Sequence, residues 1–125
     1  MNNAVTQTAA ITGAGDGIGR ALAINLNNRG VKLYLCDIDQ ARLDATLAMC
    51  DTSRAMVNTA IVDCGDQTQI EAWAAAIIAD NTCLDFLFNN AGVAYSAEFR
   101  DASLDNFEWL MNINYWGVVW SAKAL

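Results

Sequence analysis

Histidine and proline are absent from this chain of 125 residues. Without histidine, the chain cannot form a Ser-His-Asp triad, a His-paired cysteine nucleophile or an HExxH zinc site. Basic residues are also scarce, because 7 Lys and Arg are set against 14 Asp and Glu, for a formal net charge of -7. No basic run offsets this balance, so a nucleic acid is an unfavourable partner. No apolar run approaches the roughly 18 residues of a membrane-spanning helix, and we expect no membrane partner.

The composition is typical of a folded globular domain, with 54% hydrophobic and 17% charged residues. The length corresponds to one domain at most. The N-terminus carries neither a basic region nor a long apolar core, so it does not resemble a signal peptide. We therefore expect a cytoplasmic protein.

No two of the four cysteines form a Cys-x-x-Cys pair. The four are Cys36, Cys50, Cys64 and Cys83. One interpretation is a metal or redox centre. The other, which we favour, is a set of small and mostly buried thiols in a reducing cytoplasm. We therefore predict no metal site.

Short apolar runs alternate with stretches of helical periodicity along the chain. The runs cover residues 8–12, 31–36, 55–62 and 84–88, and they are typical of buried strands. Strands that alternate with helices indicate βαβ units. We predict an α/β fold with a Rossmann-like, doubly wound parallel sheet in the order βαβαβαβα.

Local signals mark the first two helices. Apolar residues at helical spacing indicate the first helix, namely Ile18, Ala21, Leu22 and Leu26. Gly30 ends this segment as a C-terminal cap would. Asp39 can cap the second helix, which carries Leu43 and Leu47.

The third helix has a predicted capping box and one apolar side. Asp66 is followed three residues later by Gln69, the spacing of a capping box. The residues predicted on the apolar side are Ile70, Trp73, Ile77 and Ile78.

The last helix is apolar on two opposite sides. Ser103 can cap it, and we predict one continuous helix from Leu104 to the end of the chain. One side carries Phe107, Leu110, Met111, Asn114, Val118, Ala122 and Leu125. The other side carries Trp109, Ile113, Trp116 and Trp120. Later parts of the fold could cover these tryptophans. We favour an interface between copies of the chain, because tryptophan is enriched at interfaces.

A glycine-rich segment joins the first strand to the first helix. It reads Thr12-Gly13-Ala14-Gly15-Asp16-Gly17-Ile18-Gly19. Glycines let the backbone approach a pyrophosphate closely, and the helix N-terminus offers unpaired N–H groups and a positive dipole end. The alternative is a plain tight turn. The strand before it and the helix after it favour a dinucleotide site.

An acidic residue, Asp37, follows the second strand. A carboxylate at this place can accept hydrogen bonds from a ribose diol and would repel a 2′-phosphate. Asp16 adds a second negative charge, and the loop contains no Arg or Lys. We therefore predict NAD as the cofactor, in preference to NADP. The alternative is an ordinary acid that precedes a helix.

Four motifs, in order along the chain, resemble those of the short-chain dehydrogenase/reductase superfamily. The segment from Thr12 to Gly19 is similar to the family's TGxxxGIG, and residues 89–92 are similar to its NNAG. Asp63 matches the acid after the third strand, and Asn114 matches the asparagine of the long interface helix. The resemblance covers essentially the whole chain and implies an NAD(P)-binding Rossmann domain.

The resemblance also implies roles for the matched residues. The residues of the glycine-rich loop near the cofactor would be Gly13, Gly15, Asp16, Gly17, Ile18 and Gly19. Asp37 would bind the adenosine ribose, while Asp63 and the backbone of Cys64 would bind the adenine. The adenosine side would be lined by Asn90, Ala91 and Gly92. Asn114, a member of the family's catalytic tetrad, would hold a water in the proton relay.

The family's reaction also needs a serine and a Tyr-x-x-x-Lys motif. None of Tyr34, Tyr95 and Tyr115 has a lysine four residues later. We therefore expect residues 1–125 to be the N-terminal, NAD-binding portion of a family enzyme, and to be inactive alone. The intact enzyme would transfer hydride between NAD and an unidentified alcohol or ketone. The alternative is a non-catalytic nucleotide-binding or oligomerisation module.

Overall fold

The apolar runs form the strands of the protein, and the segments between them form most of its helices. The computed structural model describes residues 5–80 and 83–125. In chain order the elements are β1 (Thr8–Thr12), α1 (Gly17–Asn28), β2 (Lys32–Asp37), α2 (Gln40–Ala48), β3 (Val57–Ile61), α3 (Gln67–Asp80), β4 (Phe86–Phe88), α4 (Leu104–Met111), a π-helical turn (Asn112–Trp116) and α5 (Gly117–Ala124). Within the described ranges, no helix is both long and apolar enough to cross a membrane.

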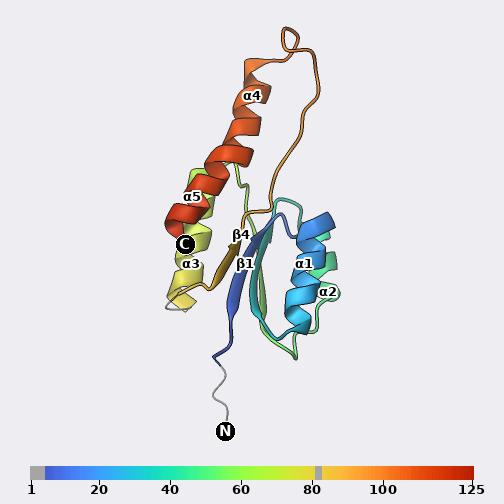
Figure 1. Ribbon diagram of the computed structural model, residues 1–125, viewed down its shortest axis with the longest axis vertical. Helices are drawn as coiled ribbons and strands as arrows, with labels where there is room; N and C mark the ends of the chain where they lie inside the picture. The colour runs from blue at the N-terminus through green and yellow to red at the C-terminus, as the bar shows by residue number, and fades with distance from the viewer. Residues whose placement is uncertain (1–4, 81–82) are drawn as a thin grey trace.

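A parallel sheet with strand order β3-β2-β1-β4 forms the centre of the fold. Ala10 of β1 pairs with Tyr34 on one side and with Leu87 on the other. Figure 1 shows α1 and α2 on one face of the sheet, and α3 and α5 on the other face. The predicted Rossmann-like α/β fold is confirmed. Because the chain changes direction across the sheet at β1, the crevice beyond the carboxyl ends of β1 and β4 is the expected ligand site.

Side chains of β1 and β2 alternate between two hydrophobic clusters, one on each face of the sheet. The cluster next to α1 and α2 contains Ala9, Ile11, Ala14, Ala23, Val31, Leu33, Leu35 and Leu43. The cluster next to α3 contains Ala10, Tyr34, Cys36, Val62, Ile70, Trp73 and Ile77. Burial of a large apolar side chain contributes about 1.5–3 kcal/mol. The two central strands are therefore held from both faces, which fixes their carboxyl ends.

Two of the four apolar residues that indicate α1 are exposed, whereas Leu22 and Leu26 pack against the cluster on this face of the sheet. Ile18 is 77% exposed and Ala21 is also exposed, whereas Gly19, Ala23 and Asn27 are buried. The reason is the close packing of the first turn, because a Cβ on Gly19 would overlap with the backbone carbonyl of residue 13. The helix therefore approaches the sheet through its small residues, and Ile18 is left at the end of the sheet.

The predicted caps of the middle helices are confirmed with one change. Asp39 accepts a hydrogen bond from the backbone N–H of Arg42 at the start of α2. Asp66 accepts one from the N–H of Gln69, but the Gln69 side chain bonds the N–H of Asp63 at 2.8 Å and so does not complete a capping box. The buried residues of α3 are Ile70, Trp73, Ala74 and Ile77, whereas Ile78 is 51% exposed, contrary to prediction.

The last helix is not one continuous α-helix. Ser103 caps α4 as predicted, by accepting a hydrogen bond from the N–H of Asn106. The π-helical turn then shifts the side-chain periodicity, since such a turn contains an extra residue. Trp120 and Leu125, predicted on opposite sides, consequently pack against the same hydrophobic cluster, next to α3. Trp109 and Trp116 are 45% and 43% exposed.

The C-terminal cap of α1 depends on a glycine, as the sequence predicts. Gly30 has a φ of 78° and its N–H bonds the carbonyl of Asn27, while the N–H of Val31 bonds the carbonyl of Leu26. We expect Gly30→Ala to lower the free energy of unfolding by about 1–2 kcal/mol, because an L-residue is strained in the left-handed region. Urea denaturation measures this. Gly30→Asn should cost less, and equal costs for Ala and Asn would contradict the explanation.

Candidate functional site

A cleft of about 340 Å³ lies beyond the carboxyl ends of β1, β2, β3 and β4. Ten of the predicted site residues line it, namely Gly13, Asp16, Gly17, Ile18, Asp37, Asp63, Cys64, Asn90, Ala91 and Gly92. The lining also includes five residues outside the predicted cofactor-binding set, namely Ile38, Arg42, Val62, Val93 and Ile113. The other three predicted residues, Gly15, Gly19 and Asn114, are not in the lining but contact residues that are, namely Asp37, Gly13 and Val93. Figure 1 places the loops after β1 and β4 at the same end of the sheet.

The glycine-rich loop brings the N-terminus of α1 to the cleft. Because Gly19 lacks a Cβ, the first turn of α1 can pack directly on the loop backbone. Gly17 lines the cleft, and apart from its chain neighbours and its own helix no atom lies within 4 Å of the place its Cβ would take. Backbone is therefore accessible here, where helix N–H groups and the dipole favour an anion.

A carboxylate also lines the cleft, next to the glycine-rich loop. Asp37, the last residue of β2, accepts a hydrogen bond from the N–H of Gly15 at 2.8 Å and from the N–H of Asp39 at 3.0 Å. A Cβ on Gly15 would lie 2.7 Å from the Asp37 Oδ2 atom, so this contact requires glycine. The carboxylate is fixed by the backbone and keeps lone pairs for hydroxyl donors.

Hydrogen bonds join the loop after β4 to the end of β1. The Thr12 Oγ1 atom accepts bonds from the N–H groups of Asn90 and Ala91 at 3.1 and 3.0 Å. The Asn90 side-chain amide donates to the carbonyls of Thr12 and Gly13 at 3.2 and 3.1 Å. These four bonds hold the two loops of the crevice at a fixed separation.

Asn114 lies in the π-helical turn, and its side chain bonds the backbone of Val93. The Asn114 Oδ1 atom accepts a bond from the Val93 N–H at 2.8 Å, and its Nδ2 atom donates to the Val93 carbonyl at 2.7 Å. Val93 lines the cleft, so Asn114 fixes one of its walls. Such turns are frequent at functional sites. The sequence shows the asparagine but not the turn.

The cysteines are free thiols in different environments. Cys36 is buried, Cys50 and Cys64 are half-buried, and Cys83 is exposed. A hydrogen bond with Cys64, together with burial, raises the pKa of the Cys36 thiol. The same bond lowers the pKa of Cys64, which lines the cleft. Within residues 5–80 and 83–125, no group of His, Cys, Asp or Glu residues could hold a metal ion.

An ion pair at the cleft joins α2 to the glycine-rich loop. The Arg42 Nη1 atom of α2 lies 3.1 Å from the Asp16 Oδ2 atom in the glycine-rich loop. The glycine-rich loop itself contains no Arg or Lys, and the fold supplies this cation from the first turn of α2. The sequence does contain a signal for Arg42. It lies three residues after the Asp39 cap, in the helical turn that follows Asp37 at the carboxyl end of β2.

The chain resembles known proteins in both sequence and fold. The family model described as short chain dehydrogenase matches residues 7–125. The putative oxidoreductase SadH of Mycobacterium tuberculosis is 35% identical over 99% of this chain. The chain spans 45% of the length of that relative.

Solved structures of the same class superpose closely. A metagenomic short-chain oxidoreductase in complex with NADP has a TM-score of 0.90 at 26% identity, over 95% of this chain and 54% of its own. A short chain dehydrogenase/reductase from Burkholderia phymatum in complex with NAD has a TM-score of 0.89 at 31% identity, over 99% of this chain and 44% of its own.

Substitution of Asn114 tests whether its side-chain amide stabilises the cleft wall at Val93. We expect Asn114→Asp to lower the free energy of unfolding at pH 7 by about 0.5–1.5 kcal/mol, because a carboxylate at this exposed position cannot donate to the Val93 carbonyl and leaves it facing a negative charge. Urea denaturation measures the change. Asn58→Asp, at an exposed position of β3, is the matched control and should change stability by less than about 0.5 kcal/mol. Equal effects of the two substitutions would contradict a role for the amide.

Proposed function

The chain belongs to the short-chain dehydrogenase family, and on that premise we propose that its cleft binds a nicotinamide adenine dinucleotide, with NAD preferred over NADP. The observation that carries the proposal is one cleft lined both by the N-terminus of α1 and by a carboxylate that backbone N–H groups hold in place. These two groups match the two polar parts of a dinucleotide, its pyrophosphate and its adenosine ribose. That both NAD and NADP complexes occur among the similar structures supports a nicotinamide cofactor.

The residues present fit the proposed ligand. Gly13 and Gly17 expose backbone in the cleft, and the first turn of α1 would receive the pyrophosphate. Asp37 would accept hydrogen bonds from the ribose hydroxyls, and Asp63 would accept one from the adenine amino group, beside Cys64. Asn90 would hold the loop that covers the adenosine. A bound nicotinamide supplies hydride chemistry.

The preference for NAD rests on charge. Asp16, Asp37 and Asp63 all line the cleft, and Arg42 is paired with Asp16. A 2′-phosphate next to Asp37 would place two like charges together. Such an arrangement costs free energy, whereas a diol gains hydrogen bonds to the same oxygen atoms.

Binding of the two reduced cofactors tests the proposal. We expect fluorescence titration of the purified protein to give a Kd for NADH at least tenfold below that for NADPH. Asp37→Asn should reduce this ratio, because it removes the charge that repels the 2′-phosphate and weakens the ribose contact. The control is Asp44→Asn on α2, which lies outside the cleft lining and should keep the ratio. Equal Kd values for the unaltered protein would contradict the preference, and binding of neither cofactor would contradict the proposal.

The proposed reaction is hydride transfer between NAD and an alcohol or ketone, by an intact family enzyme. Within residues 1–125, Asn114 is the matched member of the family's catalytic tetrad, and no Tyr-x-x-x-Lys is present. Among the described residues, no tyrosine lines the cleft. We infer that these residues bind and orient the cofactor and do not move the substrate proton, so that they are inactive alone.

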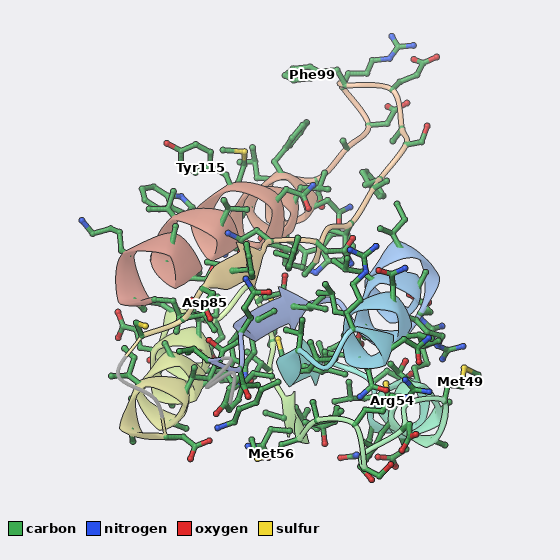
Figure 2. The ribbon with its side chains drawn as sticks, turned by 60° about the horizontal axis from the view of Figure 1, so that its bottom comes forward. Met49, Arg54, Met56, Asp85, Phe99 and Tyr115 are labelled. Carbon is green, nitrogen blue, oxygen red and sulfur yellow. The ribbon has the colours of Figure 1, made fainter. Side chains whose placement is uncertain are left out.

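A second candidate function is an oligomerisation module. The exposed aromatic residues of the last helical segment favour it, namely Trp109, Tyr115 and Trp116. Figure 2 shows Tyr115 pointing away from the body of the protein. Exposed aromatic side chains are enriched at protein interfaces. We propose a homo-oligomer formed through this helix.

Sedimentation equilibrium tests the interface. We expect the protein to associate at tens of micromolar, on the order at which modest interfaces form. Replacing Trp109 and Trp116 together by Ser should shift it toward monomer, because both are exposed aromatic anchors. Phe99→Ser, at an 83% exposed position at the tip of the loop before α4, is the control and should leave association unchanged. A monomeric unaltered protein would contradict the interface.

A further inference from the structure

We propose that Arg42 is a positioning residue for nucleotide binding. Its guanidinium holds the Asp16 carboxylate away from the first turn of α1 and so keeps that turn open to a pyrophosphate. The inference rests on the proposed function, because it assigns a role to an ion pair at the edge of the proposed cofactor cleft.

Asp16 occupies the N-cap position of α1 without capping it. Its backbone is extended, with φ -156° and ψ -178°, and its side chain makes no cap hydrogen bond. Aspartate is among the strongest N-cap residues, and its carboxylate ordinarily accepts a bond from the N–H two or three residues later. Asp39 and Ser103 do this at the starts of α2 and α4. Asp16 therefore departs from the behaviour of its residue type and of the caps at Asp39 and Ser103.

The Asp16 carboxylate is instead held by Arg42, at 3.1 Å. Arg42 is itself fixed on two sides. Its Nε atom lies 3.7 Å from the Asp39 carboxylate, and its backbone carbonyl accepts a hydrogen bond from Arg20 at 3.2 Å. Arg20 also bonds the Thr46 hydroxyl at 3.0 Å, and that hydroxyl donates to a backbone carbonyl of the glycine-rich loop. The start of α2 is thus fastened to the loop that carries Asp16.

Two interactions of similar size compete for one carboxylate. The side chains of Arg42 and Asp16 are 61% and 60% exposed, so the ion pair is weak, and a side-chain N-cap is also a modest interaction. Loss of the guanidinium would therefore shift Asp16 toward the cap. There it would occupy N–H groups of the first turn and place a negative charge where the pyrophosphate needs a positive dipole end.

Three ligands separate this role from others. NADH and ADP-ribose contain the pyrophosphate, whereas adenosine contains no phosphate. We expect Arg42→Gln to raise the Kd of NADH and of ADP-ribose about fivefold, the ratio that corresponds to one side-chain cap of ~1 kcal/mol. The Kd of adenosine, measured by competition with NADH, should not change. In an Asp16→Ala background, Arg42→Gln should no longer change the Kd of ADP-ribose, because no carboxylate is left to occupy the first turn of α1.

Each other outcome contradicts the inference. If Arg42→Gln raises the Kd of ADP-ribose equally in both backgrounds, the guanidinium attracts the anion directly. If the Kd of adenosine rises as well, Arg42 supports the adenosine end of the cleft or the fold. If the Kd of ADP-ribose does not change, Arg42 has no positioning role. Arg54→Gln is the matched control, because Arg54 forms an exposed pair with Asp51 at 3.3 Å outside the cleft and should change no Kd. Figure 2 labels Arg54 in the loop after α2. Failure of the unaltered protein to bind NADH or ADP-ribose would instead overturn the proposed function.

Discussion

The direct passage of β1 into α1 is the constraint on which the rest of the site depends. It requires Gly19 to pack on the backbone of the glycine-rich loop, where any Cβ would overlap with a carbonyl. This contact turns the small-residue side of α1 toward the sheet and leaves its first turn at the cleft. The same loop brings the Gly15 N–H to the Asp37 carboxylate. The same short loop thus positions both a helix end that favours an anion and an acid beside it.

The other walls are tied to this loop by polar contacts of single side chains. Thr12 and Asn90 join the ends of β1 and β4, and Asn114 holds Val93 from the π-helical turn. Each of these amide and hydroxyl groups bonds backbone, so each acts on the position of a loop. The cleft is therefore shaped by bonds between segments that are far apart in sequence.

Local patterns predict the parts of this architecture that depend on neighbours along the chain. The strand runs, the Gly30 and Asp39 caps and the glycine-rich segment are of this kind, because backbone conformation and helix ends are set within a few residues. The exposed Ile18, the π-helical turn and the Asp16–Arg42 pair are not predicted. They arise from packing of α1, α4 and α2 against distant segments, which periodicity does not encode. The roles of individual site residues stay predictions.

The charged side chains that line the cleft determine which groups can attract an anion there. Three carboxylates, those of Asp16, Asp37 and Asp63, line it together with one guanidinium, which is paired. Side-chain charge therefore opposes a phosphate-bearing ligand, and attraction must come from backbone N–H groups and the dipole of α1. Such attraction acts only within the first turn of a helix, so it is sensitive to any carboxylate that reaches that turn. In a cleft of this composition, the direction in which one exposed aspartate points decides how much of the helix end a ligand can use.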